Sequence, residues 1–475
     1  MRDRRFPPLP ALLPALLPAL LLGACATGPD YVAPHPPERA AAPFTSTGTA
    51  ASDAPLPDDW WRLYRDPVLD RLVQRAFAAN TDLRVAAANL ERERAVLSEA
   101  GVARFPSTQV SAGRTYGDST SSSGQGGALP DRQWTTTGGL TVSWEVDLTG
   151  RVRRTVEAAR ADVEAVEAAR DAVRVTVAAE TARNYVAACS LTESVAAARE
   201  SIAIARETLD LTGQQERVGA ASRFDVERAA VTLAGTEAAL PSLQARRQNA
   251  LFALAALLGA MPADVPADAA ACAKAPALAA AIPAGEGAEL LRRRPDLRQA
   301  ERRLAADTAR IGVTTADLYP RISLGGSTDY LRTGGSGGDW TFGIGPVLSW
   351  SFPNVGVARA RVKQSEAQVQ ASLASFDGSI LNALREVEQA LTTLNAEQRR
   401  RVSLEQADRS ARIAYDLADA RYRAGSISQL ERLVASQDRV AAQSALAESE
   451  VSLNAARVDV FKALGGGWQA GAPDR

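Results

Sequence analysis

Residues 102–112, "VARFPSTQVSA", join two different kinds of sequence. Residues 83–100 before them are rich in alanine, arginine, glutamate and leucine, which favour helix. After Pro106 the residues are short, polar and β-prone, and a near copy, "ADLYPRISLGG", occupies residues 316–326. Proline cannot continue a helix and biases the preceding residue to extended geometry. Pro106 and Pro320 therefore predict two junctions at which a helix becomes a strand.

The two junctions belong to an internal repeat. "NTDLRVAAANLERERAVLSEAGVARFP" (80–106) aligns with "RPDLRQAERRLAADTARIGVTTADLYP" (294–320) at an offset of 214 residues. Beyond the glycine- and serine-rich stretch 117–131, the offset is 206. The pairs at this second offset are Trp134 with Trp340, Trp144 with Trp350, Gly150 with Gly356, and Gly219 with Gly425. Coincidentally similar helices would not keep these residues in register, so we expect a duplicated unit with a length change in one surface loop.

Each repeat is predicted to run helix, strand, strand, long helix and return helix. Alternating apolar residues predict strands at about 107–116, 134–148, 321–330 and 340–352. Heptad-spaced apolar residues and glycine turns predict long helices at about 151–216 and 357–422, and return helices at about 224–258 and 430–464. A helix of 66 residues is roughly 100 Å long. We expect the helix before the first strand and the return helix, each about half as long, to meet end to end beside it.

The N-terminus has the pattern of a secretory signal. A basic start, "MRDRRF", precedes the apolar stretch "PPLPALLPALLPALLLGAC". Its end, "LLGAC", resembles a bacterial lipobox, which predicts removal of residues 1–24 and lipidation of Cys25, with palmitate among the acyl chains. An ordinary cleaved signal that happens to contain a cysteine is the alternative. The expected organisation is signal peptide 1–24, lipid-anchored linker 25–57, repeat 1 at 58–261, inter-repeat segment 262–289, repeat 2 at 290–467 and tail 468–475.

Composition excludes several classes of function. The net charge of −1 argues against a nucleic-acid partner. The chain has one histidine, His35, and shows no nucleophile–base pair, so no enzyme activity, cofactor or metal site is expected. The three cysteines, Cys25, Cys189 and Cys272, make neither a metal-ligand spacing nor a disulfide framework. Cys189 lies within a predicted helix and is expected to be a small packing residue.

The predicted strands have features of membrane strands. Their lengths are near the ~9–11 residues that a tilted strand needs to cross a bilayer. Trp134, Trp144, Trp340 and Trp350 hold paired positions in them, as interfacial girdles require, although a soluble sandwich also alternates and buries tryptophan. Sheet edges cannot face lipid, so four strands per chain must share a barrel. Two chains would supply eight strands and three would supply twelve, and this arithmetic leaves the choice open.

Five motifs then point to a family. They are "GAC" followed by "GPDY" (28–31), "DDWWRLYRDPVLDRLV" (58–73), "RRRPDLRQAE" (292–301), "LYP" (318–320) and "YRAGSISQLE" (422–431). With these motifs the chain resembles the TolC-like outer-membrane efflux proteins, in their NodT-type lipoprotein branch. The resemblance implies a mixed fold of helices and membrane strands. It also implies a homotrimer whose twelve-stranded β-barrel is continuous with a periplasmic α-helical barrel.

The resemblance also implies partners. An inner-membrane pump of the resistance-nodulation-division class would deliver drugs or other small toxic compounds through a periplasmic adaptor protein. The chain would then be a passive exit duct, anchored by lipid in the outer membrane of a Gram-negative bacterium. An outlet for protein secretion or metal-ion export is the alternative within transport. A lipid-anchored periplasmic coiled-coil scaffold, without a membrane sheet, is the alternative from another class.

The two glycine turns are the candidate gate and adaptor-docking tips. Gly219 and Gly425 are expected to cap helix C-termini, and Ser222 and Ser428 helix N-termini. The full candidate set is Gly219, Ser222, Asp225, Tyr422, Gly425, Ser428, Leu430, Glu431 and Val434. The resemblance places channel-closing carboxylates at Glu431 and Val434, with Asp225 as the repeat-1 partner of Glu431. Val434 is apolar, which departs from that pattern, and Leu430 could add an apolar constriction. Helix capping alone would also account for the charged residues.

Overall fold

The computed structural model describes residues 26–118, 132–278, 281–334 and 337–469, which divide between two compact units. Unit 1 contains the described residues of 1–34 together with Leu90–Val166 and Ala300–Phe376. Unit 2 contains His35–Asn89, Glu167–Gln299 and the described residues from Asp377 onward. The predicted signal peptide 1–24 and the predicted lipidation site Cys25 lie outside the described residues.

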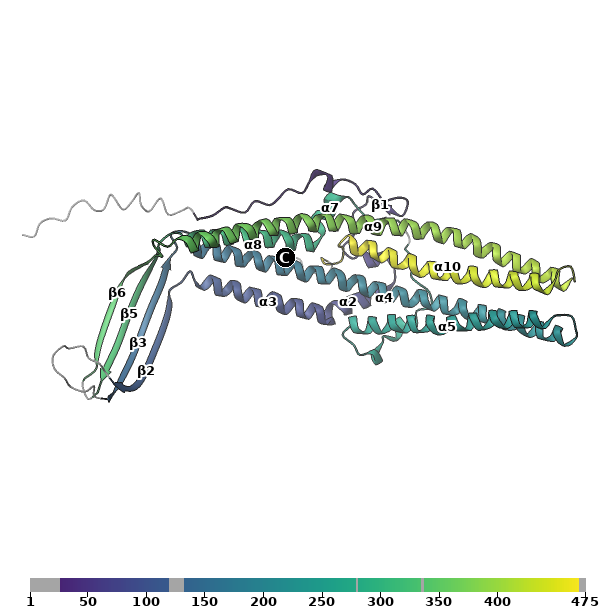
Figure 1. Cartoon of the computed structure of the whole chain (residues 1–475), viewed down its shortest axis with the longest axis horizontal. Helices are drawn as coiled ribbons and strands as arrows, with labels where there is room; N and C mark the ends of the chain where they lie inside the picture. The colour runs from purple at the N-terminus through teal and green to yellow at the C-terminus, as the bar shows by residue number, and fades with distance from the viewer. Residues whose placement is uncertain (1–25, 119–131, 279–280, 335–336, 470–475) are drawn as a thin grey trace, which may run out of the picture. The chain divides into compact units, whose positions relative to one another are not determined.

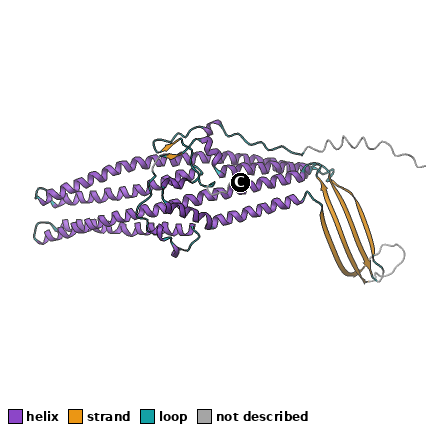
Figure 2. Cartoon of the chain, turned by 180° about the vertical axis from the view of Figure 1, so that it is seen from behind, coloured by secondary structure: helices purple, strands orange, loops and turns teal. Residues whose placement is uncertain are grey.

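Unit 1 contains an antiparallel sheet in the order β2-β3-β5-β6 (Figures 1 and 2). The strands are β2 (Ser107–Asp118), β3 (Arg132–Val146), β5 (Arg321–Thr333) and β6 (Asp339–Ser349). Pro106 and Pro320 directly precede β2 and β5, at the positions expected for the two junctions. Within the described residues, β2 and β6 are the edges of this sheet and each has one unpaired side.

The two halves of the sheet place their tryptophans alike. Trp134 packs on Tyr116 and Trp340 on Tyr330, each with ring centroids 5.2 Å apart. At the other end of the strands, the Trp144 indole donates a hydrogen bond to Arg104 O (3.0 Å). The Trp350 indole donates to Leu318 O (3.2 Å) at the matched position. The tryptophan pairs therefore form two separate levels, one at each end of the sheet.

The helices follow the predicted order. α4 (Arg151–Arg217) and α9 (Gly356–Arg423) are the long helices, and α5 (Arg223–Leu257) and α10 (Gln429–Ala463) are the return helices. α3 (Thr81–Val102) and α8 (Pro295–Ala316) lead into the sheet. The shorter elements are η1 (Glu38–Ala41), β1 (Ala51–Ser52), η2 (Trp60–Tyr64), α2 (Pro67–Ala79), η3 (Pro262–Asp264), α6 (Ala267–Ala270), β4 (Ile282–Pro283) and α7 (Gly287–Arg293). β1 pairs with β4 in parallel.

In unit 2, half-length helices meet end to end in both repeats. The Asn80 side chain caps α3 and donates a hydrogen bond to Leu257 O at the end of α5 (3.1 Å). Its repeat-2 counterpart, Arg294, donates to Ala463 O at the end of α10 (2.8 Å). Leu257 and Ala463 are themselves counterparts at the offset of 206. Different side chains thus satisfy the same orphan carbonyl at the end of each return helix.

Small residues dominate the packed face of α4. Among the heptad-spaced apolar residues of α4, Val152, Val156 and Val177 are buried, whereas Val163 and Val166 are only partly buried. Several alanines are fully buried instead, among them Ala168, Ala178, Ala179 and Ala182.

The core of unit 2 is anchored by larger side chains. Trp60 and Trp61 are 0 % exposed, and Trp60 stacks on Phe461 with ring centroids 4.4 Å apart.

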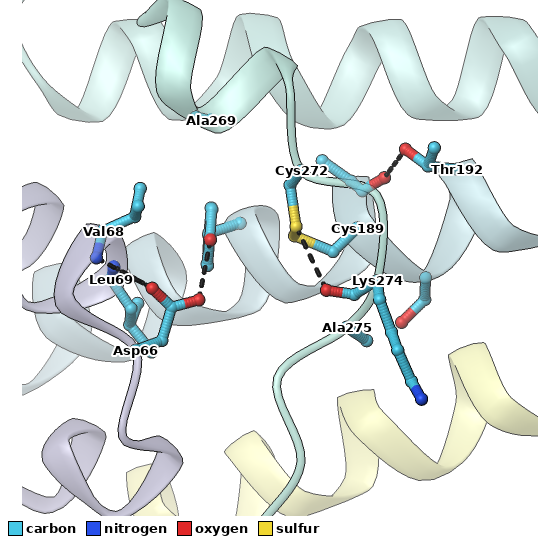
Figure 3. Close-up of a disulfide and its surroundings, with 12 residues drawn as sticks. Asp66, Val68, Leu69, Cys189, Thr192, Ala269, Cys272, Lys274 and Ala275 are labelled. Atoms are coloured by element: carbon cyan, nitrogen blue, oxygen red, sulfur yellow. Dashed lines mark hydrogen bonds between the residues drawn. A yellow bond between two sulfur atoms is a disulfide. The ribbon is translucent and has the colours of Figure 1, made fainter.

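A disulfide joins Cys189 of α4 to Cys272, which follows α6 (Figure 3). The expectation that the cysteines form no disulfide and that Cys189 is only a packing residue is therefore wrong. The two cysteines are 83 residues apart in sequence, yet their Cα atoms are 5.2 Å apart. α5 returns the chain to the level of Cys189, and the inter-repeat segment then lies against α4. Sequence spacing does not reveal this proximity because it depends on where a 35-residue helix ends.

Candidate functional site

The two candidate tips are built alike in unit 2. Gly219 and Gly425 have φ values of +76° and +68°, a left-handed conformation that favours glycine. A Cβ on either would meet nothing within 4 Å, so backbone conformation alone requires these glycines. Ser222 and Ser428 then cap α5 and α10, each in a reciprocal capping box with the acidic residue three positions later.

The two candidate gate carboxylates are engaged in these caps. Asp225 accepts a hydrogen bond from Ser222 N (3.1 Å), and Glu431 accepts one from Ser428 N (2.7 Å). The hydrogen bonds from the Ser428 backbone and hydroxyl hold the pKa of Glu431 below its usual value. Asp225 and Glu431 each bond within their own turn. The capping role is thus sufficient for both carboxylates within one chain.

The second tip, the turn between α9 and α10 at Gly425 and Ser428, is held by polar contacts that the sequence analysis did not predict. Gln429, at the start of α10, donates a buried hydrogen bond to Thr212 Oγ1 of α4 (2.7 Å). Arg432, with its side chain 3 % exposed, donates to Asp419 Oδ1 of α9 (2.8 Å). Its guanidinium also lies 5.6 Å from the centre of the Tyr422 ring. The available sequence signal was Arg432 itself, the residue directly after the capping acid Glu431. The stretch "LERLV" (430–434) otherwise looks like an ordinary amphipathic helical turn, which hides that Arg432 is buried.

The apolar candidates at this tip are partly solvent-exposed. Leu430 is 40 % exposed and Val434 is 42 % exposed, whereas Leu433 between them is buried. Leu430 and Val434 are four residues apart and therefore share one face of α10. The tip thus presents a small apolar patch beside the Glu431 carboxylate.

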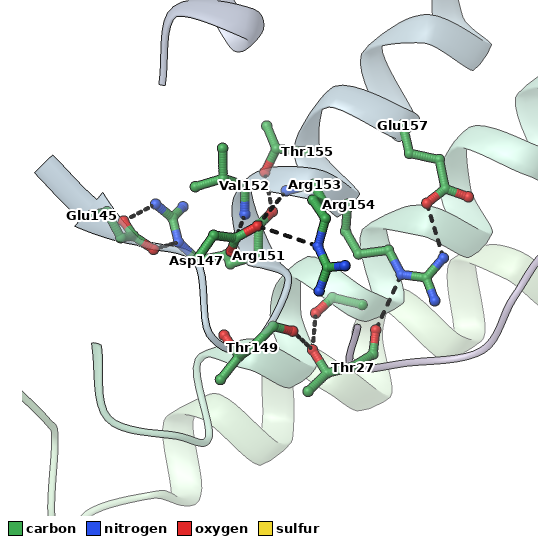
Figure 4. A network of polar contacts seen from close by, with 11 residues as sticks. Thr27, Glu145, Asp147, Thr149, Arg151, Val152, Arg153, Arg154, Thr155 and Glu157 are labelled. Atoms are coloured by element: carbon green, nitrogen blue, oxygen red, sulfur yellow. Dashed lines mark hydrogen bonds and ion pairs between the residues drawn. The ribbon is translucent and has the colours of Figure 1, made fainter. Parts of the chain in front are cut away.

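In unit 1, the residues that follow Cys25 are clasped against the start of α4 (Figure 4). The Thr27 hydroxyl hydrogen-bonds Thr149 O (3.0 Å) and Gly312 O of α8 (3.1 Å). Arg154, with its side chain 4 % exposed, donates to Thr27 O (3.2 Å) and pairs with Asp30 (2.6 Å). A Cβ on Gly312 would lie 2.6 Å from Thr27 O. The "GPDY" motif is therefore part of a structural clasp between the two repeats.

Metal sites and membrane-spanning helices are both absent from the described residues. No group of three or more histidine, cysteine, aspartate or glutamate side chains is placed to hold a metal ion there. None of the described helices is both long and apolar enough to cross a membrane.

Comparison with known proteins gives consistent matches over nearly the whole chain. The family model described as "Outer membrane efflux protein" matches residues 72–260 and 287–466. The antibiotic efflux pump outer membrane protein ArpC of Pseudomonas putida is 31 % identical, over 96 % of each chain. Nodulation protein T of Rhizobium leguminosarum bv. viciae is 31 % identical, over 95 % of this chain and 92 % of the relative. The solved structure of the outer-membrane channel OprN matches with a TM-score of 0.84 and 36 % identity, covering 94 % of this chain and all of that one.

The chain therefore belongs to the family of outer membrane efflux proteins. It has the fold of the TolC-like channels and is the outer-membrane exit duct of a tripartite efflux system, not an enzyme. The sequence-based expectation of this family and function is confirmed.

Proposed function

We propose that three copies of this chain close one twelve-stranded barrel in the outer membrane, continuous with a helical barrel in the periplasm. The observation that carries the proposal is the sheet of unit 1, whose two edge strands each have one unpaired side within the described residues and whose apolar side chains are exposed. On β6, Phe342 is 85 % exposed and Ile344 is 86 % exposed. Open edges and exposed apolar faces suit lipid contact only after the edges pair with other copies.

The tryptophan levels support the same membrane placement. Trp134 and Trp144 are ten residues apart on β3, as are Trp340 and Trp350 in repeat 2. Ten residues of antiparallel strand extend roughly 33 Å, and a tilt of about 40° reduces this to about 25 Å across the membrane. This distance equals the height of the apolar band in outer-membrane barrels, about 25 Å.

The duplication predicts how neighbouring copies pair. β3 and β5 form the contact between repeat 1 and repeat 2 within one chain, with Val142 opposite Gly326. The contact between β6 of one copy and β2 of the next joins the counterparts of these strands. The counterpart of Val142 at the offset of 206 is Leu348, and the counterpart of Gly326 at the offset of 214 is Ala112. We therefore expect Leu348 of one copy to lie opposite Ala112 of the next. The proposed barrel therefore has a defined register at the seam between copies.

A cysteine pair tests this register and the number of copies. Leu348→Cys combined with Ala112→Cys should cross-link neighbouring copies in outer-membrane preparations, because directly opposed Cβ atoms lie about 5 Å apart. Leu348→Cys combined with Val110→Cys is the matched control, since diagonal neighbours are about 7–8 Å apart. A covalent ladder that ends at three copies supports the trimer, and one that ends at two replaces it with a dimer. The absence of any cross-link, together with the absence of conductance in planar bilayers, would refute the proposed barrel.

We also propose that the tips dock the periplasmic adaptor and close the resting channel. The partner pump would then supply the energy, and the duct would be passive. The variant Glu431→Gln distinguishes a channel-closing role of Glu431 from its helix-capping role, because glutamine keeps the capping hydrogen bond and removes the charge. If the carboxylate closes the channel, single-channel conductance rises in Glu431→Gln while the second tip stays folded. A conductance that stays at the wild-type level assigns Glu431 to capping alone.

Lipid anchoring through Cys25 completes the proposal, with residues 1–24 removed as a signal peptide. Its support is the clasp, because Ala26 packs against Gly150 at the start of α4, four residues after β3 ends. The residue directly after the cysteine is thus held at the base of a proposed membrane strand. Intact-mass analysis of the mature protein tests the anchor: an unmodified N-terminal residue other than Cys25 would rule it out.

A further inference from the structure

The start of α9 in unit 1 carries a cluster of exposed cations. Arg359, Arg361 and Lys363 lie in the first two turns of this helix, and all three are exposed. Asp317 is 3.8 Å from Arg361 and pairs more closely with Arg321. Among the described residues, the charged groups of Arg359 and Lys363 have no ion-pair or hydrogen-bond partner.

This placement is unfavourable for an isolated helix. Arg359 and Lys363 are four residues apart, so two like charges face the same side. The N-terminal end of a helix already carries positive potential, and the first turn of α9 contains no acidic residue. Both effects would be relieved by an anion bound outside the chain.

Repeat 1 shows the same region with its charges neutralised. Arg151 pairs with Glu145, Arg153 with Asp147 and Arg154 with Glu157. At the matched positions of repeat 2 the three carboxylates are replaced by a serine, a proline and a lysine, namely Ser351, Pro353 and Lys363. Folding of the junction therefore does not require unpaired cations, since the other repeat folds with paired ones.

A cleft lies beside Arg361. It has a volume of about 250 Å³, and its walls include Tyr319, Trp350 and Asn354. Arg321 and Arg361 also line it, together with the Asp317 carboxylate that pairs with them. Tyr319 is 49 % exposed and Trp350 is 46 % exposed. Arginine beside exposed tyrosine and tryptophan is the side-chain chemistry found where proteins meet lipid headgroups.

We propose that this junction of repeat 2 binds the phosphate of an anionic phospholipid headgroup in the periplasm-facing leaflet of the outer membrane. The inference rests on the proposed membrane sheet, because it requires β6 to end at that leaflet. Arg361 and Arg321 would hold the phosphate in the cleft, and Trp350 and Tyr319 would contact the region below it. Arg359 and Lys363, on another side of α9, would add positive potential toward the headgroup layer. Repeat 1, whose cations are already paired, would not bind it.

Native mass spectrometry of the delipidated, detergent-purified protein tests the proposal. The protein is incubated with equal amounts of phosphatidylglycerol and phosphatidylcholine that have the same acyl chains. We expect preferential retention of phosphatidylglycerol, falling about fivefold for each cation removed in Arg359→Gln, Arg361→Gln and Lys363→Gln. The matched control removes three exposed arginines further along α9, in Arg385→Gln, Arg399→Gln and Arg409→Gln, with the same change of net charge.

The outcomes separate this inference from the proposed function. Equal retention of the two lipids by a conducting wild-type oligomer, or an equal loss in the control triple variant, overturns the lipid site and leaves the barrel intact. Displacement of bound phosphatidylglycerol by added inorganic phosphate overturns the lipid assignment in favour of a free-phosphate site. A protein with neither oligomer nor conductance refutes the proposed barrel itself. Wild-type conductance in the triple variant confirms that it is folded.

Discussion

Reduction of the Cys189–Cys272 disulfide should destabilise unit 2 measurably. The bond closes a loop of 83 residues, for which the chain-entropy relation gives about 4.5 kcal/mol as an upper value. The observed loss should be smaller, about 2–4 kcal/mol. The return of α5 along α4 already restricts the same loop. Near the disulfide, the described residues 268–275 keep three polar contacts to the helices: Arg71 to Asp268 (3.0 Å), Arg247 Nη2 to Ala270 O (2.5 Å) and Ala275 N to Glu193 (3.4 Å).

The assay is guanidinium unfolding followed by far-UV circular dichroism, with oxidised and reduced protein compared at equal concentration. Cys189→Ala combined with Cys272→Ala should match the reduced protein, which controls for effects of the reductant. Hydrogen exchange should show the largest loss of protection in residues 262–278. Peptide mapping that finds the two thiols free in periplasmically expressed protein, or an unchanged unfolding midpoint on reduction, refutes the reasoning.

Three further predictions concern single side chains. Gly312→Ala should weaken the N-terminal clasp by about 1–3 kcal/mol through overpacking, seen as faster proteolysis before residue 35, whereas Gly378→Ala, whose Cβ meets nothing within 4 Å, should not. Asp419→Asn should cost about 3–5 kcal/mol by leaving the buried Arg432 unpaired, and unchanged hydrogen exchange at the tip would contradict this. Folding lowers the pKa of Glu431. The ionised carboxylate therefore contributes to the stability of the cap at pH values above its unfolded-state pKa, and this contribution is lost as the pH falls through its folded-state pKa. Hydrogen-exchange protection factors at the second tip, which are corrected for the intrinsic pH dependence of amide exchange, should therefore fall on acidification in the wild type, and less so in Glu431→Gln.

Local chemistry explains why the element boundaries were predictable from sequence. The long helix expected at 151–216 is observed at Arg151–Arg217, and the return helix expected at 430–464 at Gln429–Ala463. Proline, glycine and serine mark these boundaries, and each acts through its own backbone or its immediate neighbours. The second strand of repeat 2 was expected at 340–352 but ends at Ser349, where strand pairing stops. The prediction was too long because the alternation of apolar residues continues through Trp350 and Phe352.

Contacts between distant residues were not predictable in this way. The disulfide depends on where α5 ends, and the pairing of Arg432 with Asp419 depends on how α9 and α10 pack at the tip. The repeat alignment placed Asn80 opposite Arg294, but two side chains so different in size and charge gave no sign that both bind the end of a return helix. Closure of the proposed barrel would be a property of several copies, and one chain supplies only the unpaired sides of its edge strands.

The duplication provides an internal standard for separating folding from function. Both repeats must form the same junction, the same long helix and the same tip, so positions that remain equivalent report what that fold requires. The glycines at +76° and +68°, the two capping boxes and the tryptophan hydrogen bonds are of this kind. A position that differs while the backbone stays the same carries a side chain that the shared fold does not require, unless both side chains make the same contact, as Asn80 and Arg294 do. The replacement of Glu157 by Lys363 at a matched site is such a difference, and it makes the charge of the second junction a feature that interaction with another molecule has to explain.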